Sequence, residues 1–112
     1  MTMSEGFVRV GSVGEIPEGE MRAYDIDAGR VAVAHVEYRL FAFGDECTHA
    51  GCALSEGEFD DRANTVTCRC HESVFDVETG EPIGGPAQDP LPVFAVREVE
   101  GWVELSSQPV QP

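Results

Sequence analysis

Residues 31–44, VAVAHVEYRLFAFG, hold two short apolar runs separated by only two residues, Glu37 and Tyr38. Apolar runs of this length without helical periodicity are typical of β-strands, and a two-residue break between two strands is typical of a hairpin turn. We therefore predict strands over 31–36 and 39–44, joined by a tight turn.

The same kind of pattern continues on both sides of this hairpin. No window of about 11 or more residues repeats its apolar positions every 3.6 residues or so, and nothing therefore predicts an amphipathic helix. Short apolar runs between turn signals predict further strands over 7–11, 21–26, 65–68, 73–77, 93–99 and 102–106. With about eight short strands, the chain is predicted to be all-β, folded as an antiparallel sandwich or barrel.

Length and composition narrow the class of protein. A chain of 112 residues predicts a single domain over 1–112, and 42% apolar with 25% charged residues is typical of a soluble globular protein. No apolar run approaches the roughly 20 residues of a membrane helix. The first residues, MTMSEGFVRVG, lack the basic region and apolar run of a signal peptide. We therefore expect a cytoplasmic protein that does not bind a membrane.

The chain is strongly acidic. It carries 21 acidic against 7 basic residues, all of them arginine, for a net charge of −14. Phosphate backbones require a basic face, so the charge argues against a nucleic-acid partner. It is compatible with a basic protein partner that is attracted by electrostatic steering, and equally with a charge that only maintains solubility.

One region, from about residue 45 to 92, interrupts the strand pattern because it is rich in Cys, His, Gly and Pro. Functional sites are often built on loops that project from a rigid sheet, and we expect this region to form a subdomain at one end of the β scaffold. The chain has four cysteines. In a protein of cytoplasmic character they indicate metal or redox chemistry before a disulfide framework.

Two short motifs, CTHAGC at 47–52 and CRCHES at 68–73, supply the candidate ligands. Taken as Cys-x-His and Cys-x2-His, each motif offers one thiolate and one imidazole. Such a set suits either a zinc ion or an iron–sulfur cluster. The ligands in this interpretation are Cys47, His49, Cys68 and His71.

Other ligand sets are also possible. An all-cysteine cluster would use Cys47, Cys52, Cys68 and Cys70, although the C-x4-C spacing does not continue as it does in plant-type ferredoxins. Cys70 could replace Cys68, but it directly precedes His71, and successive side chains of an extended loop point apart. Zinc fingers more often pair cysteine with cysteine and histidine with histidine. The remaining histidine, His35, lies within a predicted strand and is interpreted as a structural or surface residue.

The two motifs and their surroundings resemble the Rieske family, which binds a [2Fe–2S] cluster with two cysteines on one iron and two histidines on the other. CTHAGCALSEG resembles the first cluster loop of that family. VTCRCHESVFDVETGEPIGGPAQDPLPVFAV resembles the second loop, the strand after it and the third loop, so that the match runs from Phe43 to Val96. The resemblance implies Cys47, His49, Cys68 and His71 as ligands of one [2Fe–2S] cluster.

The resemblance also implies roles for residues around the cluster. Cys52 and Cys70 occupy positions that form a disulfide between the two loops in the membrane-bound respiratory members. Ser73 occupies the position of a serine that hydrogen-bonds to a cluster sulfur in high-potential members, whereas Phe75 stands where those members have a tyrosine. Gly84, Gly85 and Pro86 correspond to the third loop, which covers the cluster.

Two positions depart from the family pattern. Arg69 stands where proline is common, and Glu72 stands where glycine is common. Their opposite charges nearly cancel beside the cluster, so we predict no net effect on the reduction potential from this pair. With a serine at 73 and no tyrosine at 75, we expect a potential between the two ends of the Rieske range, which runs from about −150 to +300 mV.

The resemblance implies a Rieske-type ferredoxin, a carrier of one electron and not an enzyme in its own right. By analogy, an NAD(P)H-dependent flavoprotein reductase would supply the electron and a terminal oxygenase, often one that attacks aromatic rings, would receive it. Both contacts would be transient and electrostatic, with the carrier acting as a monomer. The alternatives are the small subunit of an assimilatory nitrite reductase, and a metal-stabilised binding module without redox function.

Overall fold

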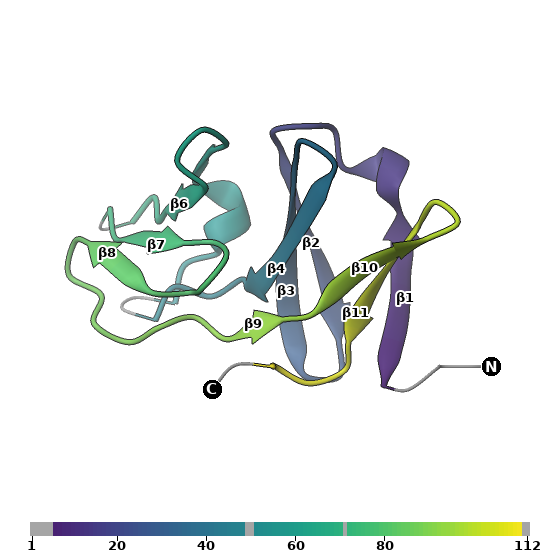
Figure 1. Ribbon diagram of the computed structural model, residues 1–112. Helices are drawn as coiled ribbons and strands as arrows, with labels where there is room; N and C mark the ends of the chain where they lie inside the picture. The colour runs from purple at the N-terminus through teal and green to yellow at the C-terminus, as the bar shows by residue number, and fades with distance from the viewer. Residues whose placement is uncertain (1–5, 49–50, 71, 111–112) are drawn as a thin grey trace.

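The computed structural model describes residues 6–48, 51–70 and 72–110. Within them the strands form three antiparallel sheets, ordered β1-β11-β10, β2-β3-β4-β9 and β5-β6-β7-β8 (Figure 1). The predicted all-β class is therefore confirmed. The strands are β1 (Phe7–Ser12), β2 (Met21–Ile26), β3 (Gly29–Val36), β4 (Arg39–Gly44), β5 (Glu58–Asp60), β6 (Thr65–Thr67), β7 (Val74–Asp76), β8 (Pro82–Gly84), β9 (Val93–Phe94), β10 (Val96–Val99) and β11 (Trp102–Ser106).

Strands β3 and β4 form the predicted hairpin. They pair in register from Val31 opposite Gly44 to Val36 opposite Arg39. Glu37 and Tyr38 have φ angles of 50° and 70°, which is the left-handed backbone that a two-residue hairpin turn of type I′ requires. The chain therefore makes this turn without the usual Asn-Gly pair.

Both faces of the central hairpin are buried, which explains why its sequence is continuously apolar. On one face Val31, Val33 and Ala42 belong to a group that we call the scaffold core: Ile16, Val31, Val33, Ala42, Phe94, Val103 and Leu105. On the other face Phe41 and Phe43 belong to a second group, the site core: Ala32, Ala34, Val36, Phe41, Phe43, Cys47, Leu54, Val66, Cys68, Phe75, Val77, Ala87 and Leu91. Alternate residues of one hairpin thus join the scaffold to the region of the candidate ligands.

The single strand predicted over 93–99 is wrong, because the chain changes sheets in the middle of it. β9 pairs with β4, whereas β10 pairs with β11. Ala95, between the two strands, donates its N–H to Ser106 Oγ at 3.0 Å and accepts the Ser106 N–H at 2.9 Å. The apolar pattern is continuous across the change because both sheets contribute to the scaffold core.

The prediction of about eight strands is also too low, because it missed β5 and β8. Each has only three residues, and charged residues, proline or glycine dominate their sequences, EFD and PIG. Neighbouring strands, rather than intrinsic preference, define them: β5 pairs with β6 and β8 with β7.

The β5–β6 and β7–β8 connections are built in the same way. Asp60 and Asp76 each accept, on Oδ1, the backbone N–H groups two and three residues later. Their carbonyl oxygens accept the N–H groups of Asn64 and Gly80, and these two residues have φ angles of 58° and 82°. The Asn64 carbonyl also accepts the N–H of Val77, the residue that follows β7. This hydrogen bond joins the β5–β6 turn to the start of the β7–β8 turn.

Helical structure is limited, among the described residues, to two 3-10 turns at Val13–Glu15 and Leu54–Glu56. In the same part of the chain no helix has the length and apolar character needed to cross a membrane.

Candidate metal centre

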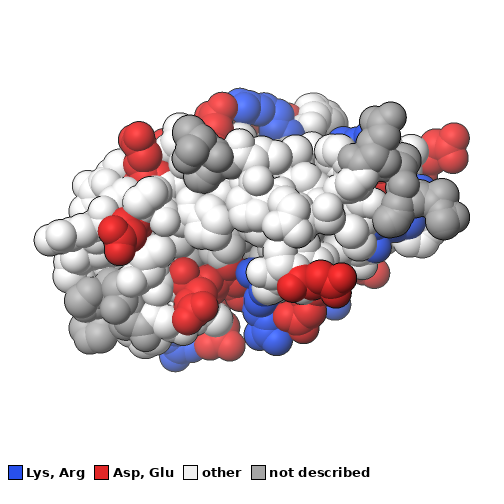
Figure 2. Space-filling model, turned by 90° about the horizontal axis from the view of Figure 1, so that it is seen from below, with Lys and Arg blue, Asp and Glu red and all other residues white. Residues whose placement is uncertain are grey.

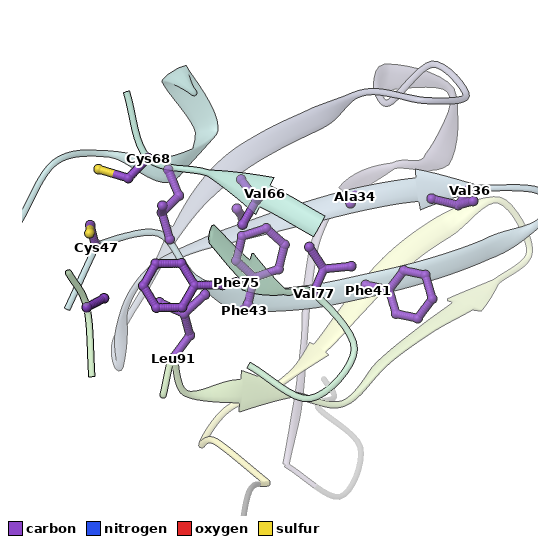
Figure 3. Close-up of a cluster of buried hydrophobic side chains, with 13 residues drawn as sticks. Ala34, Val36, Phe41, Phe43, Cys47, Val66, Cys68, Phe75, Val77 and Leu91 are labelled. Carbon is purple, nitrogen blue, oxygen red and sulfur yellow. The ribbon is translucent and has the colours of Figure 1, made fainter. Parts of the chain in front are cut away.

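Cys47 and Cys68 are the two candidate cysteine ligands, and both lie in the site core. Their exposed fractions are 1% and 0%. Cys47 follows β4, and Cys68 follows β6. Figure 3 shows both side chains at the same end of the core, beyond the ring of Phe75, with the Cys68 sulfur directed away from the apolar side chains. The apolar core therefore brings together two cysteines that are 21 residues apart in the sequence.

The first loop is held at its base by Asp45. This carboxylate is only 2% exposed; Oδ1 accepts the Ser55 N–H at 2.6 Å and Oδ2 accepts the Ser55 hydroxyl at 2.8 Å. Burial raises the pKa of Asp45, although the Ser55 hydrogen bonds and the Arg30 charge act in the opposite direction. The sequence interpretation missed Asp45 and Ser55. They are ten residues apart, and no local motif connects them.

Within the first loop, backbone hydrogen bonds fix the position of Cys47. Its N–H donates to the Cys52 carbonyl at 2.9 Å, and its carbonyl accepts the Gly51 N–H at 2.8 Å. Gly51 has a φ of 77°, which a glycine adopts at little cost. The Thr48 hydroxyl donates to the Asp89 carbonyl at 2.8 Å, so the first loop is also attached to the third.

The second loop turns tightly after Cys68. The Cys68 N–H donates to the Ser73 carbonyl at 2.8 Å, and the Cys68 carbonyl accepts the Glu72 N–H at 2.9 Å. Glu72 has a φ of 63°, in the left-handed region. This explains why glycine is common at this position in the Rieske family, and it shows that Glu72 occupies a backbone conformation that costs free energy for a residue with a side chain.

Ser73 is fully buried, and its Oγ accepts the Ala87 N–H of the third loop at 3.1 Å. Because the hydroxyl is the acceptor in this bond, its own hydrogen remains able to donate to another group. Gly85, with a φ of 85°, packs directly on Ser73: a Cβ at Gly85 would lie 2.6 Å from the Ser73 Cα. Pro86, which lies between Gly85 and Ala87, is exposed. Phe75 is fully buried in the site core.

Cys52 and Cys70 form a disulfide that joins the first and second loops, with their Cα atoms 6.5 Å apart. This is the pair that the family resemblance implies. An exposed ion pair between Arg69 and Glu56, with 3.4 Å between Nη1 and Oε1, also links the two loops but contributes little. The disulfide counts against an all-cysteine cluster, because two of its four ligands are bound to each other.

The histidines divide into two groups. The predicted ligands His49 and His71 lie outside the described residues. His35 lies in β3, where its Nδ1 is 2.7 Å from the Ile16 carbonyl oxygen. A ring nitrogen bound to the backbone in this way agrees with the interpretation of His35 as a structural residue.

Comparison with known proteins gives a consistent result. The family model for the Rieske [2Fe-2S] domain matches residues 6–95. The biphenyl dioxygenase ferredoxin subunit of Pseudomonas sp. (strain KKS102) is 39% identical over 95 residues, which cover 85% of this chain and 85% of that protein.

Two solved structures share the fold over their whole length. The ferredoxin of carbazole 1,9a-dioxygenase from Nocardioides aromaticivorans IC177 superposes with a TM-score of 0.89 at 26% identity, covering 93% of this chain and 100% of that one. A chain in the complex of reduced oxygenase and oxidized ferredoxin of carbazole 1,9a-dioxygenase superposes with a TM-score of 0.87 at 30% identity, covering 97% and 100%.

Proposed function

The chain belongs to the Rieske [2Fe-2S] domain family, and on that premise we propose that it carries single electrons from an NAD(P)H-dependent flavoprotein reductase to a terminal oxygenase that attacks aromatic rings. Its cofactor is a Rieske-type [2Fe–2S] cluster. The similar proteins are named as ferredoxin subunits of dioxygenases, and one solved relative is a ferredoxin in complex with its oxygenase. These names favour a carrier over the small subunit of a nitrite reductase.

The observation that carries this proposal is the division of the four cysteines. Cys52 and Cys70 are joined to each other, whereas Cys47 and Cys68 form no disulfide and lie buried at one end of the site core. Two thiolates suit one iron of a Rieske cluster, and two imidazoles suit the other. We assign the imidazoles to His49 and His71, which follow the two cysteines at the family spacing.

The donor set determines the charge of the site. Two ferric ions, two sulfides and two thiolates add to zero, and neutral imidazoles leave the oxidised site neutral. An all-cysteine site would be negative before it received an electron. In surroundings of low dielectric constant, an electron enters a neutral site more easily, and histidine ligation therefore raises the reduction potential.

The residues around the ligands tune and protect this site. We assign Ser73 as a hydrogen-bond donor to the cluster; its Oγ accepts the Ala87 N–H, and its own hydrogen can still donate. In the proposed site, the Cys52–Cys70 disulfide and the third loop, through Gly85 and Pro86, would cover the cluster and limit the access of water. Full burial of Phe75 is consistent with a packing role in place of the tyrosine of high-potential members.

The surface suits brief contacts with partners. With a net charge of −14, the protein attracts basic surfaces from a distance, and the small interfaces that are typical of electron transfer allow it to leave again. We place the protein in the cytoplasm, where NAD(P)H-dependent reductases work.

Metal analysis of the purified protein tests the proposal. We expect two iron atoms and two acid-labile sulfides per chain, and an electron paramagnetic resonance signal of Rieske type after reduction. Cys47→Ser and Cys68→Ser should each abolish this signal. As a matched control, the double variant Cys52→Ser, Cys70→Ser should keep it. Zinc without sulfide, or equal loss of iron from all these variants, would contradict the proposed function.

A further inference from the structure

Three of the four sulfur atoms lie close together. The Sγ atoms of Cys52, Cys68 and Cys70 are all within 4.8 Å of one another, and these are the only three metal-binding side chains that gather so closely in the described part of the chain. Two of them form the disulfide between the loops. A cysteine that we assign as an iron ligand is thus the immediate neighbour of a disulfide, whereas Cys47, the other assigned ligand, lies outside this group.

We propose that Cys68 undergoes intramolecular thiol–disulfide exchange with the Cys52–Cys70 bond whenever iron is not bound to it. In the step, the Cys68 thiol loses its proton to water and its sulfur forms a bond to the sulfur of Cys52, while the Cys52–Cys70 bond breaks and Cys70 leaves as a thiolate. One disulfide is broken and one is formed, so the exchange requires no oxidant or reductant.

The exposure of the two residues favours this direction of attack. Cys70 is exposed, whereas Cys52 is half-buried. The departing sulfur carries negative charge, and water solvates a charge better than a buried position does. Attack on Cys52, with departure of Cys70 into solvent, is therefore favoured over attack on Cys70.

The exchange has a consequence for loading of the cluster. The product still joins the two loops, now through Cys52 and Cys68, but it has used an iron ligand and cannot hold the cluster. Cys70 can reverse the step, because the same three sulfurs remain adjacent. Iron bound to Cys68 prevents the exchange and keeps the Cys52–Cys70 pairing. Disulfide pairing and cluster binding are thereby coupled, an inference that goes beyond the proposed function but rests on Cys68 as a ligand.

Disulfide mapping tests the proposal directly. The iron-loaded protein is divided, and iron is removed from one half with a chelator without air at about pH 8.5, near the ordinary pKa of a thiol. Both halves are quenched with acid, alkylated, digested and analysed by mass spectrometry. We expect only the Cys52–Cys70 link in the loaded half. In the chelated half we expect Cys52–Cys68 to appear together with alkylated Cys70.

Two variants, and a comparison of how often each disulfide link occurs in one sample, make the result decisive. Cys68→Ser and Cys47→Ser should not hold the cluster and are mapped as purified: Cys68→Ser should show only the Cys52–Cys70 link, and Cys47→Ser should still exchange. Links that contain Cys47 should be at least about tenfold rarer than Cys52–Cys68, because proximity and not unfolding drives the step. Chelated protein that keeps only Cys52–Cys70, or links to Cys47 as frequent as links to Cys68, would overturn the proposal. Iron and sulfide content tests the proposed function separately.

Discussion

The scaffold strands and the site subdomain, residues 45–92, are stabilised in different ways. Strands β1 to β4 are six or eight residues long, whereas β5 to β8 have three residues each. The site subdomain adds individual contacts to its apolar core, such as Asp45 with Ser55, Ser73 with Ala87 and the Cys52–Cys70 bond. The charged residues gather mainly around the margins of the face in Figure 2, with a broad uncharged surface between them. The comparison teaches that long paired strands specify the scaffold, whereas the site combines short strands with single contacts between its loops.

The largest expected effects come from the two cores. Leu105 and Phe75 are both fully buried, Leu105 in the scaffold core and Phe75 in the site core beside Cys47 and Cys68. We expect Leu105→Ala to lower the free energy of unfolding by about 2–5 kcal/mol and Phe75→Ala by about 3–5 kcal/mol, measured by chemical denaturation. Only Phe75→Ala should also release iron faster, followed by visible absorbance. Equal rates of iron release from variants of equal stability would remove the distinction between the cores.

Loss of the disulfide is the next largest effect, and the scaffold has no counterpart to it. Cys52 and Cys70 are 18 residues apart in sequence. A disulfide that closes a loop of this size contributes about 3 kcal/mol, largely by restricting the unfolded chain. We therefore expect Cys52→Ser with Cys70→Ser to lower the free energy of unfolding by about that amount while iron content is retained. An unchanged denaturation midpoint would show that hydrogen bonds alone hold the loops.

The Asp45 contact should have an intermediate effect. Asp45→Ala leaves the partly buried Ser55 N–H and hydroxyl without their acceptors, and we expect a loss of about 1–3 kcal/mol in the free energy of unfolding. Asp45→Asn keeps one acceptor oxygen and should lose less. Hydrogen exchange of the Ser55 amide locates the effect: it should accelerate in Asp45→Ala, while amides of β3 stay protected. Uniform acceleration would mean that the site and the scaffold open together.

Two buried serines provide a closer test. Ser73 in the site and Ser106 in the scaffold each accept a backbone N–H on Oγ, from Ala87 and Ala95. Ser73→Ala should cost about 1 kcal/mol of stability, and Ser106→Ala more, because the Ser106 hydroxyl also donates to the Gln108 carbonyl at 2.8 Å. Only Ser73→Ala should also lower the reduction potential, by tens of mV, since a hydrogen bond of about 1 kcal/mol to the reduced site corresponds to roughly 40 mV for one electron. Voltammetry of both variants measures this shift. An equal shift of the reduction potential in both variants would exclude a direct hydrogen bond from Ser73 to the site.

The fold could be predicted wherever neighbouring residues determine the structure. The hairpin of β3 and β4 is visible because its two apolar runs and the two-residue break between them are local features. The end of β9 at Phe94 is not visible, because it depends on which strand lies beside it. The same reason hides β5 and β8, whose short polar or proline-containing sequences become strands only through their partners.

The site follows the same rule. The spacing of Cys47, His49, Cys68 and His71 and the pair of additional cysteines can be found in the sequence, because each motif is contiguous. The contacts that support the loops cannot be found in the sequence. Thr48 reaches a backbone carbonyl 41 residues away, and Ser73 accepts a backbone N–H 14 residues away. Backbone atoms carry no sequence signal, so only the structure reveals which residues hold the loops of the candidate ligands in place.

The smallest effect concerns a residue that the sequence did mark as unusual. Glu72 and Tyr38 both have left-handed φ angles, in the site and at the scaffold hairpin, and neither is glycine. Glu72→Gly and Tyr38→Gly should each raise the free energy of unfolding by about 0.5 kcal/mol, because glycine adopts this conformation without steric cost. Only Glu72→Gly should also raise the reduction potential, since it removes a negative charge beside the site. Glu72→Gln separates the two causes, because it should raise the potential without raising stability. Equal stabilisation by glutamine and glycine would show that charge repulsion, and not the backbone, is what makes Glu72 costly.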